Sequence, residues 1–220
     1  WHAYQQRCVD GQWFPEGDPQ AWREGLQRCR DRLVELGHPP KVTRIGGTHC
    51  SNAIMEILEE LCIDVDMTAL PGRVRSDGFL QLDWAPTPEA PYAPSRADYR
   101  VPGDPSVSLL EIPLSMVAVR AEYDEKPFRR YIDLSFHSDA LWPGLRSFLD
   151  GAPPYLVAIA HPSAVLAEIV ECRHGLLSFQ IEQFSENLRF ILEHCAVSGR
   201  DCAFTTASQL AALIGKGELL

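Results

Sequence analysis

The sequence lacks any apolar run close to the roughly 20 residues that a membrane-spanning helix needs. It also lacks a cluster of basic residues, and its 20 Lys and Arg are outnumbered by 30 Asp and Glu, which gives a net charge of −10. Such an acidic chain repels nucleic-acid phosphates and anionic lipids. We therefore expect no membrane span and no nucleic-acid partner.

Several motifs with well-defined chemistry are also missing. The chain contains no Walker loop, no Gly-x-Gly-x-x-Gly, no His-Glu-x-x-His and no Gly-x-Ser-x-Gly. Its seven cysteines are odd in number and show no Cys-x-x-Cys spacing, which argues against a zinc ribbon and a disulfide framework. This cysteine usage fits a reducing compartment, and no signal peptide is visible, so we expect a cytoplasmic protein.

What is present is an ordinary globular composition. Hydrophobic residues make up 45% of the 220 residues and charged residues 23%. A chain of this length most economically forms one domain, which we expect over 1–220. We find no internal repeat and no low-complexity segment.

Apolar periodicity and capping residues predict alternating helices and strands. In the first half we expect a helix from Asp18-Pro19 to Gly37, a strand over 41–45, a helix capped by Ser51, and a strand over 63–68. In the second half we expect strands over 109–113, 116–119, 155–160 and 203–205, helices over 139–149 and 179–194, and a final helix with a Thr206-to-Gln209 capping box. This alternation predicts an α/β fold with a parallel sheet or barrel.

A proline-rich segment over 71–105 interrupts the alternation. A long loop without periodicity inside a compact domain is usually functional or disordered. Its tryptophan and tyrosines argue against disorder, because aromatic residues are scarce in unfolded segments. We expect an ordered excursion over a pocket.

The candidate site residues start with Arg44, which ends an expected strand and is followed by two glycines that let the backbone approach a ligand. His49 in the same loop is a possible substrate contact. His161 ends the apolar strand over 155–160 and could act as a general acid, although a histidine packed beneath a loop fits the same position.

Three further candidates have less sequence context. His2, next to aromatic residues, could bind a metal, but histidines near a terminus are commonly inert. Asp83 and Trp84 pair a carboxylate with an indole, a combination that binds sugar hydroxyls and sugar faces. Surface loops also produce such pairs by chance.

Several short motifs follow one another along the chain. They are Trp1-His2-Ala3-Tyr4, Arg44-Ile45-Gly46-Gly47, Ser51-Asn52, Val65-Asp66, Leu70-Pro71-Gly72-Arg73, Asp83-Trp84-Ala85-Pro86, Pro91-Tyr92-Ala93-Pro94-Ser95, Leu110-Glu111-Ile112-Pro113 and His161-Pro162. In this order they resemble the polysaccharide deacetylase family, the nodulation-protein-B-type carbohydrate esterases.

The resemblance implies a distorted (β/α)7-type barrel and a divalent metal, usually zinc, that activates water for attack on an acetamide. Transferred to this chain, it implies that His2 binds the metal, that Arg44 orients a catalytic aspartate, and that His161 protonates the leaving amine. Asp83 and Trp84 would shape the sugar groove. The aspartate pair and second metal histidine of the family are not found in these 220 residues.

We therefore expect a metal-dependent deacetylase-type hydrolase that acts on an N-acetylated sugar or polysaccharide, with the other metal ligands upstream of Trp1. Two alternatives remain open. The first is an inactive relative that binds carbohydrate without metal, and the second is an amidase that cleaves a C–N bond outside sugars.

Overall fold

The computed structural model describes residues 8–9, 12–13, 19–48, 50–76, 81–103, 106–160, 176–178 and 180–219. Contacts divide the chain into two compact units. Unit 1 comprises Trp1–Pro113 and Thr206–Glu218, and unit 2 comprises Leu114–Thr205 and Leu219–Leu220. The single domain expected over 1–220 stays a prediction.

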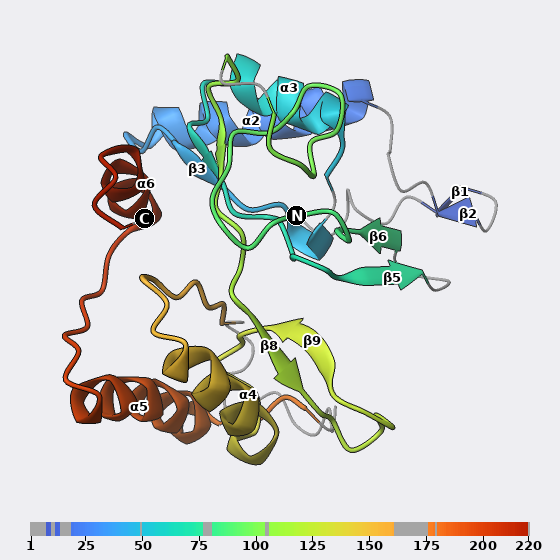
Figure 1. The fold of residues 1–220 in the computed structure, drawn as a ribbon. Helices are drawn as coiled ribbons and strands as arrows, with labels where there is room; N and C mark the ends of the chain where they lie inside the picture. Colours follow the sequence, from blue (N-terminus) through green and yellow to red (C-terminus); the bar gives the residue numbers. More distant parts are fainter. Residues whose placement is uncertain are drawn as a thin grey trace. The chain divides into compact units, whose positions relative to one another are not determined.

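Unit 1 combines helices with three small sheets (Figure 1). Its elements are β1 (Cys8–Val9), β2 (Gln12–Trp13), α2 (Pro19–Glu35), β3 (Val42–Thr43), the 3-10 turn η1 (Gly46–Thr48), α3 (Asn52–Glu60), β4 (Val65–Asp66), β5 (Val74–Ser76), β6 (Gln81–Asp83), β7 (Leu110–Glu111) and α6 (Ala207–Gly215). The β1–β2 and β5–β6 pairs are antiparallel, whereas β3, β4 and β7 form a parallel sheet in that order.

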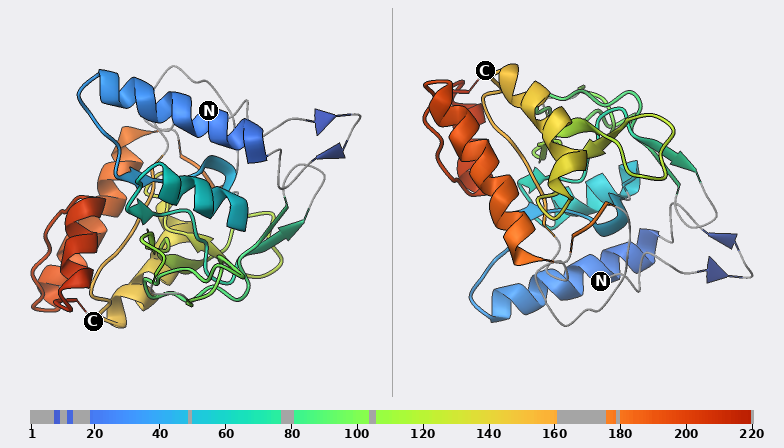
Figure 2. Two further views of the ribbon diagram at one scale, coloured as in Figure 1. Left: turned by 90° about the horizontal axis from the view of Figure 1, so that it is seen from above. Right: turned by 90° about the horizontal axis from the view of Figure 1, so that it is seen from below.

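The parallel sheet positions the residues of interest. Thr43 pairs with Asp66 and Asp66 pairs with Glu111, so the three strands end in step. Helices α2 and α3 lie side by side in both views of the unit (Figures 1 and 2), and α6 contacts β4. The sheet is therefore supported by helices from both ends of the chain.

Helix α3 follows its sequence signals closely. Ser51 caps it, accepting a 3.2 Å hydrogen bond from the backbone N–H of Ile54, as the capping rule predicts. Its apolar face is buried in the main core of unit 1, through Ile54, Met55, Ile57 and Leu58.

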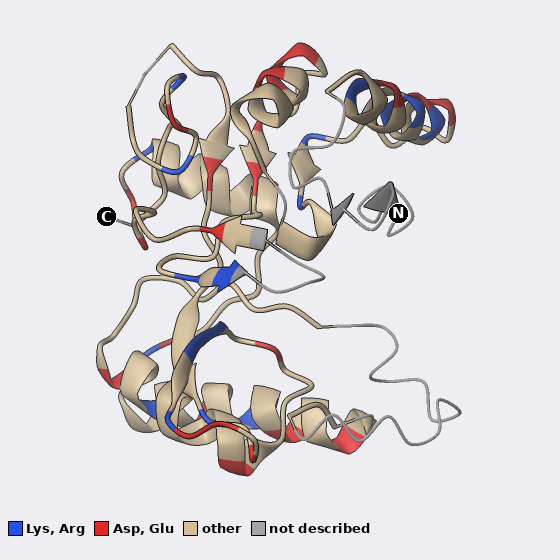
Figure 3. Ribbon diagram, turned by 90° about the vertical axis from the view of Figure 1, so that its right-hand side faces the viewer, with Lys and Arg blue, Asp and Glu red and all other residues tan. Residues whose placement is uncertain are grey.

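Helix α2 also forms where expected, but it buries less than its apolar stripe suggested. Leu26 is buried, whereas Leu33 and Leu36 are 38% and 54% exposed. Basic and acidic residues occur along the same helix (Figure 3), which is typical of a solvated face. The sequence pattern therefore predicted the helix correctly and overestimated its contribution to the core.

The described part of the proline-rich excursion is fastened to α3. The side chain of Asn52 donates to the carbonyl of Ala97 at 2.9 Å and accepts from the N–H of Tyr99 at 2.9 Å. At the other end of α3, Glu59 pairs with Arg96 at 2.9 Å. The two hydrogen bonds of Asn52 to the backbone and the Glu59–Arg96 ion pair hold the excursion in place without regular secondary structure.

Unit 2 is built from an antiparallel hairpin and two helices. Its elements are β8 (Met116–Val119), β9 (Phe128–Tyr131), α4 (Ser138–Asp150) and α5 (Ile181–Val197). Helix α4 packs on β8, and Gly144 allows the close approach, because a Cβ there would lie 2.1 Å from the carbonyl oxygen of Ala118. The core of this unit contains Ile132, Leu141 and Leu145, all fully buried.

Two expected strands of unit 2 differ from the structure. Residues 155–160 form only an isolated bridge, Asp133 with Ile159, and their burial alternates instead of covering both faces. The strand expected over 203–205 was wrong, since these residues have no regular structure and are exposed. An apolar or β-branched run forms a strand only where a neighbouring strand can pair with it.

The α/β class is confirmed at the level of mixed helices and sheets. Within the described residues, the strands form four separate small sheets, and none of these is closed into a barrel. The same residues contain no helix with the length and apolarity required to span a bilayer.

Candidate functional site

Two carboxyl groups meet at the carboxyl ends of neighbouring parallel strands. Asp66 ends β4 and Glu111 ends β7, and the two residues are direct partners in the sheet register. Paired residues of neighbouring strands point to the same face, so their side chains lie together. Both are fully buried, with 0% and 1% exposure. Ligand sites of α/β proteins commonly form at this edge of a sheet.

Hydrogen bonds tie this acid pair, Asp66 and Glu111, to two loops. Thr68 Oγ1 donates to Asp66 Oδ1 at 2.8 Å and accepts from the backbone N–H of Ile45 at 2.8 Å. Glu111 Oε1 accepts from the N–H of Ala69 at 3.0 Å. Asp66 Oδ2 is buried and receives no hydrogen bond from the N–H and O–H groups that the structure describes.

Burial raises the pKa of both carboxyl groups, because the low-dielectric interior disfavours charge. The charge of Asp66 raises the pKa of Glu111 further, whereas hydrogen bonds from Glu111 and Thr68 oppose the rise at Asp66. Two adjacent buried charges repel each other, so we expect the two carboxyl groups to share one proton over the pH range between their two pKa values. Carried on Glu111, that proton would supply a donor for Asp66 Oδ2.

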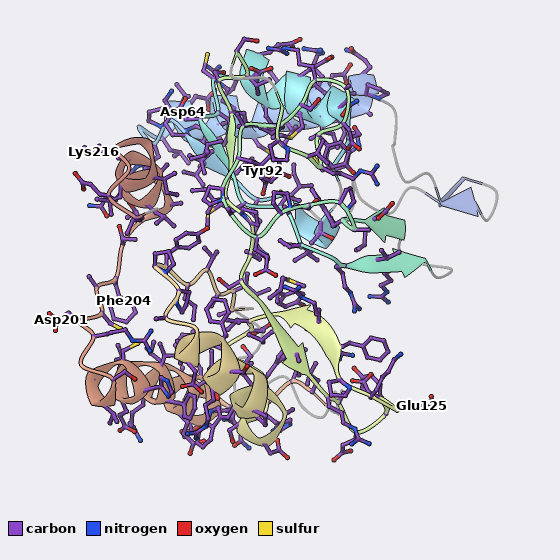
Figure 4. All side chains as sticks on the ribbon, in the orientation of Figure 1. Asp64, Tyr92, Glu125, Asp201, Phe204 and Lys216 are labelled. Carbon is purple, nitrogen blue, oxygen red and sulfur yellow. The ribbon has the colours of Figure 1, made fainter. Side chains whose placement is uncertain are left out.

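Two further titratable groups border the acid pair. Burial raises the pKa of the Cys50 thiol, and the neighbouring Asp66 and Glu111 raise it further. Burial and Glu111 likewise raise the pKa of Tyr92, which lies within unit 1 (Figure 4) and whose hydroxyl donates to the carbonyl of Tyr99 at 3.2 Å. Both groups therefore remain protonated and neutral beside the acid pair.

Arg44 provides positive charge at the same edge of the sheet. It follows β3 directly, and its side chain is exposed while its guanidinium group lowers the pKa of Asp66. The next residues form the turn Gly46–Thr48, in which Gly47 and Thr48 have positive φ angles of 66° and 56°. The two glycines after Arg44, Gly46 and Gly47, predicted a bend of the backbone at this point. The strained, positive φ angle of Thr48 shows that the turn is tight.

Asp83 and Trp84 occupy different environments. Asp83 is exposed and pairs with Arg100 at 2.7 Å. Trp84 is 1% exposed, its indole N–H donates to the carbonyl of Thr48 at 3.2 Å, and its ring meets Tyr99 edge to face. A buried indole has no free face on which a sugar could stack. The expected role of Trp84 in a sugar groove therefore stays a prediction, and the burial of its side chain does not support it.

The three candidate histidines, His2, His49 and His161, lie outside the described residues. Their expected roles as metal ligand, substrate contact and general acid stay predictions. The positive charge of Arg44 acts on Asp66, whereas the expected convergence of Arg44 with His2 and His161 stays a prediction.

The implied metal has no ready-made site among the described residues. In that part of the chain, no group of three or more His, Cys, Asp or Glu side chains is arranged to hold a metal ion. The acid pair alone supplies two carboxyl groups that share a proton, and a protonated carboxyl is a poor metal ligand.

The acid pair was missed as a site, although the sequence carried a signal for it. Asp66 and Glu111 each stand between two apolar residues, Val65 and Met67 in the first case and Leu110 and Ile112 in the second. A buried charged residue is exceptional unless it is paired, so two of them at equivalent strand positions indicate a pair.

We compared the chain with known protein families, curated proteins and solved structures. No family model, no curated protein and no solved structure matches this chain.

Proposed function

We propose that the protein is a deacetylase-type hydrolase that removes the acetyl group from an N-acetylated sugar or polysaccharide, and that unit 1 carries its general base. The observation that carries this proposal is the acid pair at the strand ends, with Arg44 beside it. Strongly perturbed carboxyl groups at the carboxyl edge of a parallel sheet are typical of functional sites. The order of motifs that resembles polysaccharide deacetylases supplies the substrate class.

In this proposal Asp66 is the general base. Amide hydrolysis needs a group that takes a proton from the attacking water, and such a base works best with a pKa near the working pH. Burial raises the pKa of Asp66 to about 6, and the guanidinium group of Arg44 favours its ionised form. Glu111 holds the shared proton, so that the buried pair carries a single negative charge.

The remaining parts of the proposal come from the resemblance. They are a (β/α)7-type barrel of which β3, β4 and β7 would be neighbouring strands, a divalent metal bound through His2, and His161 as the acid for the leaving amine. A carbohydrate partner and a cytoplasmic location belong to the same proposal.

The test is an assay of acetate release. The purified full chain is incubated with N-acetylglucosamine oligomers and with a panel of non-sugar acetamides, with and without added zinc. Asp66→Asn keeps the size of the side chain and an acceptor for Thr68 but removes the base. Glu125→Gln, at the exposed loop between β8 and β9 (Figure 4), is the matched control.

We expect acetate release from the oligomers, a loss of roughly 10²–10⁴ in rate for Asp66→Asn, and no loss for the control. Oligomer binding without acetate release would instead identify a carbohydrate-binding relative. Release from non-sugar acetamides alone would identify an amidase. An unchanged rate in Asp66→Asn would remove Asp66 from the mechanism.

A further inference from the structure

We infer that Thr68 is a positioning residue that couples the acid pair to the turn that follows Arg44. Its hydroxyl lies between the two parts, donating to Asp66 Oδ1 and accepting from the backbone N–H of Ile45, each at 2.8 Å. The significance of this coupling for catalysis rests on the proposed function, but the coupling itself can be measured without activity.

The turn is held at both of its ends. At its start, Thr68 accepts the N–H of Ile45, and at its end the indole of Trp84 donates to the carbonyl of Thr48 at 3.2 Å. The N–H of Thr48 closes the turn on the carbonyl of Ile45 at 3.2 Å. Because Arg44 immediately precedes this turn, the hydrogen bond at Ile45 fixes the direction in which Arg44 leaves the sheet.

The hydrogen bond from Thr68 depends on the charge of the acid pair. An ionised carboxylate is a stronger acceptor than a neutral carboxyl, so Asp66 holds the hydroxyl best when it is ionised. If Glu111 also loses its proton, two buried charges repel each other, and water must enter to solvate them. The turn is therefore expected to be most firmly held while the pair carries one proton.

The groups that face the pair support this single-proton state. Arg44, from the end of β3, favours the ionised form of Asp66. Cys50, before α3, and Tyr92, from the proline-rich excursion, border the pair as neutral groups. The N–H of Ala69 donates to Glu111 from the loop after β4. The pH response consequently belongs to the two carboxyl groups.

The test is hydrogen exchange of backbone amides from pH 5 to 9, followed by NMR and corrected for the intrinsic effect of pH on exchange. The N–H of Met67 bonds to the carbonyl of Thr43 within the same sheet, so its protection reports the stability of the sheet. The ratio of the protection factor of Ile45 to that of Met67 therefore reports changes in the turn alone. The proteins compared are the wild type, Thr68→Val, Thr68→Ser and Glu111→Gln.

In the wild type we expect the ratio to rise as Asp66 ionises near pH 6 and to fall at higher pH, where Glu111 also loses its proton. Thr68→Val should lower the maximum about tenfold, because the Ile45 N–H loses its partner. Thr68→Ser should restore it, and Glu111→Gln should abolish the fall at high pH. An unchanged ratio in Thr68→Val, or an unchanged high-pH fall in Glu111→Gln, would overturn the inference.

If Thr68→Val does not fold, the serine and glutamine variants still decide the matter. A Glu111→Gln variant that keeps the wild-type pH profile contradicts the coupling regardless of the valine variant. Since no substrate is used, failure here leaves the acetate assay as a separate test of the proposed function.

Discussion

The indole Nε1–H of Trp142 in α4 donates a 2.8 Å hydrogen bond to Oδ1 of Asn187 in α5. The amide nitrogen of Asn187 donates in turn to the carbonyls of Leu134 and Phe136, at 2.9 and 2.7 Å. Asn187 is completely buried. Its side chain alone provides hydrogen-bond partners for the indole N–H of Trp142 and for the carbonyls of Leu134 and Phe136.

Asn187→Ala should therefore be strongly destabilising, by about 2–5 kcal/mol, because it leaves a donor and two acceptors buried without partners. Urea denaturation followed by circular dichroism measures the loss. Trp142→Phe is the comparison, since it removes one hydrogen bond while keeping an aromatic ring against Phe190, and it should cost less. Equal costs for the two variants would contradict a network centred on Asn187.

Gly144 makes a second prediction for unit 2. A methyl group at this position would meet the carbonyl oxygen of Ala118 at 2.1 Å, so Gly144→Ala must push α4 away from β8. We expect a loss of about 1–3 kcal/mol or more in the free energy of unfolding. Gly215→Ala in α6 is the matched control, because nothing lies within 4 Å of its added methyl group. It should be neutral or slightly stabilising.

The acid pair predicts how stability depends on pH. Unfolded carboxyl groups titrate near pH 4, whereas burial raises the pKa of Asp66 to about 6 and that of Glu111 well above its usual value. From about pH 4 upward the unfolded chain releases protons that the folded chain retains. The stabilisation by these protons is complete below pH 4 and is lost as the pH rises through the folded-state values.

Glu111→Gln should flatten this decline, because glutamine keeps an acceptor for Ala69 and a donor for Asp66 but has no proton to lose. At pH 8 we expect the variant to be more stable than the wild type, because only the wild type keeps a carboxyl group whose pKa is raised by burial. Urea midpoints at pH 5, 6.5 and 8 measure this. The exposed Glu125→Gln should follow the wild type, and parallel curves for all three proteins would disprove the effect.

We expect the main effect of Trp84→Ala to be a loss of folding stability and not a loss of sugar binding. The indole is 1% exposed and packs against Tyr99, and removing a buried tryptophan typically costs about 3–5 kcal/mol. Thermal unfolding measures the loss, and Trp84→Phe separates packing from the hydrogen bond to Thr48. If Trp84→Ala unfolded like the wild type yet bound acetylated oligomers more weakly, the indole would be a sugar contact after all.

His161→Ala tests the acid role that the resemblance gives to this histidine. If His161 protonates the leaving amine, the variant should fold normally and lose roughly 10²–10⁴ in turnover. Acetate release at saturating substrate measures this, with the exposed His38→Ala as the control. Full activity of His161→Ala would assign the proton to another group.

Local signals in the sequence predicted much of unit 1. Ser51 as a helix cap and the Thr206–Gln209 capping box are both confirmed, because each depends only on neighbouring backbone groups. In unit 2, the β8 strand was also predicted correctly over Met116–Val119. Helix-capping signals involve only residues within one turn of the helix, so they do not depend on how distant segments pack.

The remaining features depend on distant partners. Strand β9 was missed because two consecutive charged residues, Arg129 and Arg130, are not typical of a buried strand. In the structure, Asp124 in the hairpin loop forms an ion pair with Arg130 at 2.8 Å and compensates its charge. The acid pair needs two strands that are 45 positions apart, from 66 to 111, to come into register. Neither pairing is visible to periodicity, which compares residues only within one segment.

Helix α6 has a consequence for how the polypeptide is made. It contacts β4 and buries Leu210 and Ile214, yet the whole of Leu114–Thr205 lies between it and the other elements of unit 1. On the ribosome, Leu114–Thr205 therefore emerge before α6 is available to unit 1. During that interval the strands of unit 1 lack this cover, and a chaperone that shields exposed apolar segments would act on them.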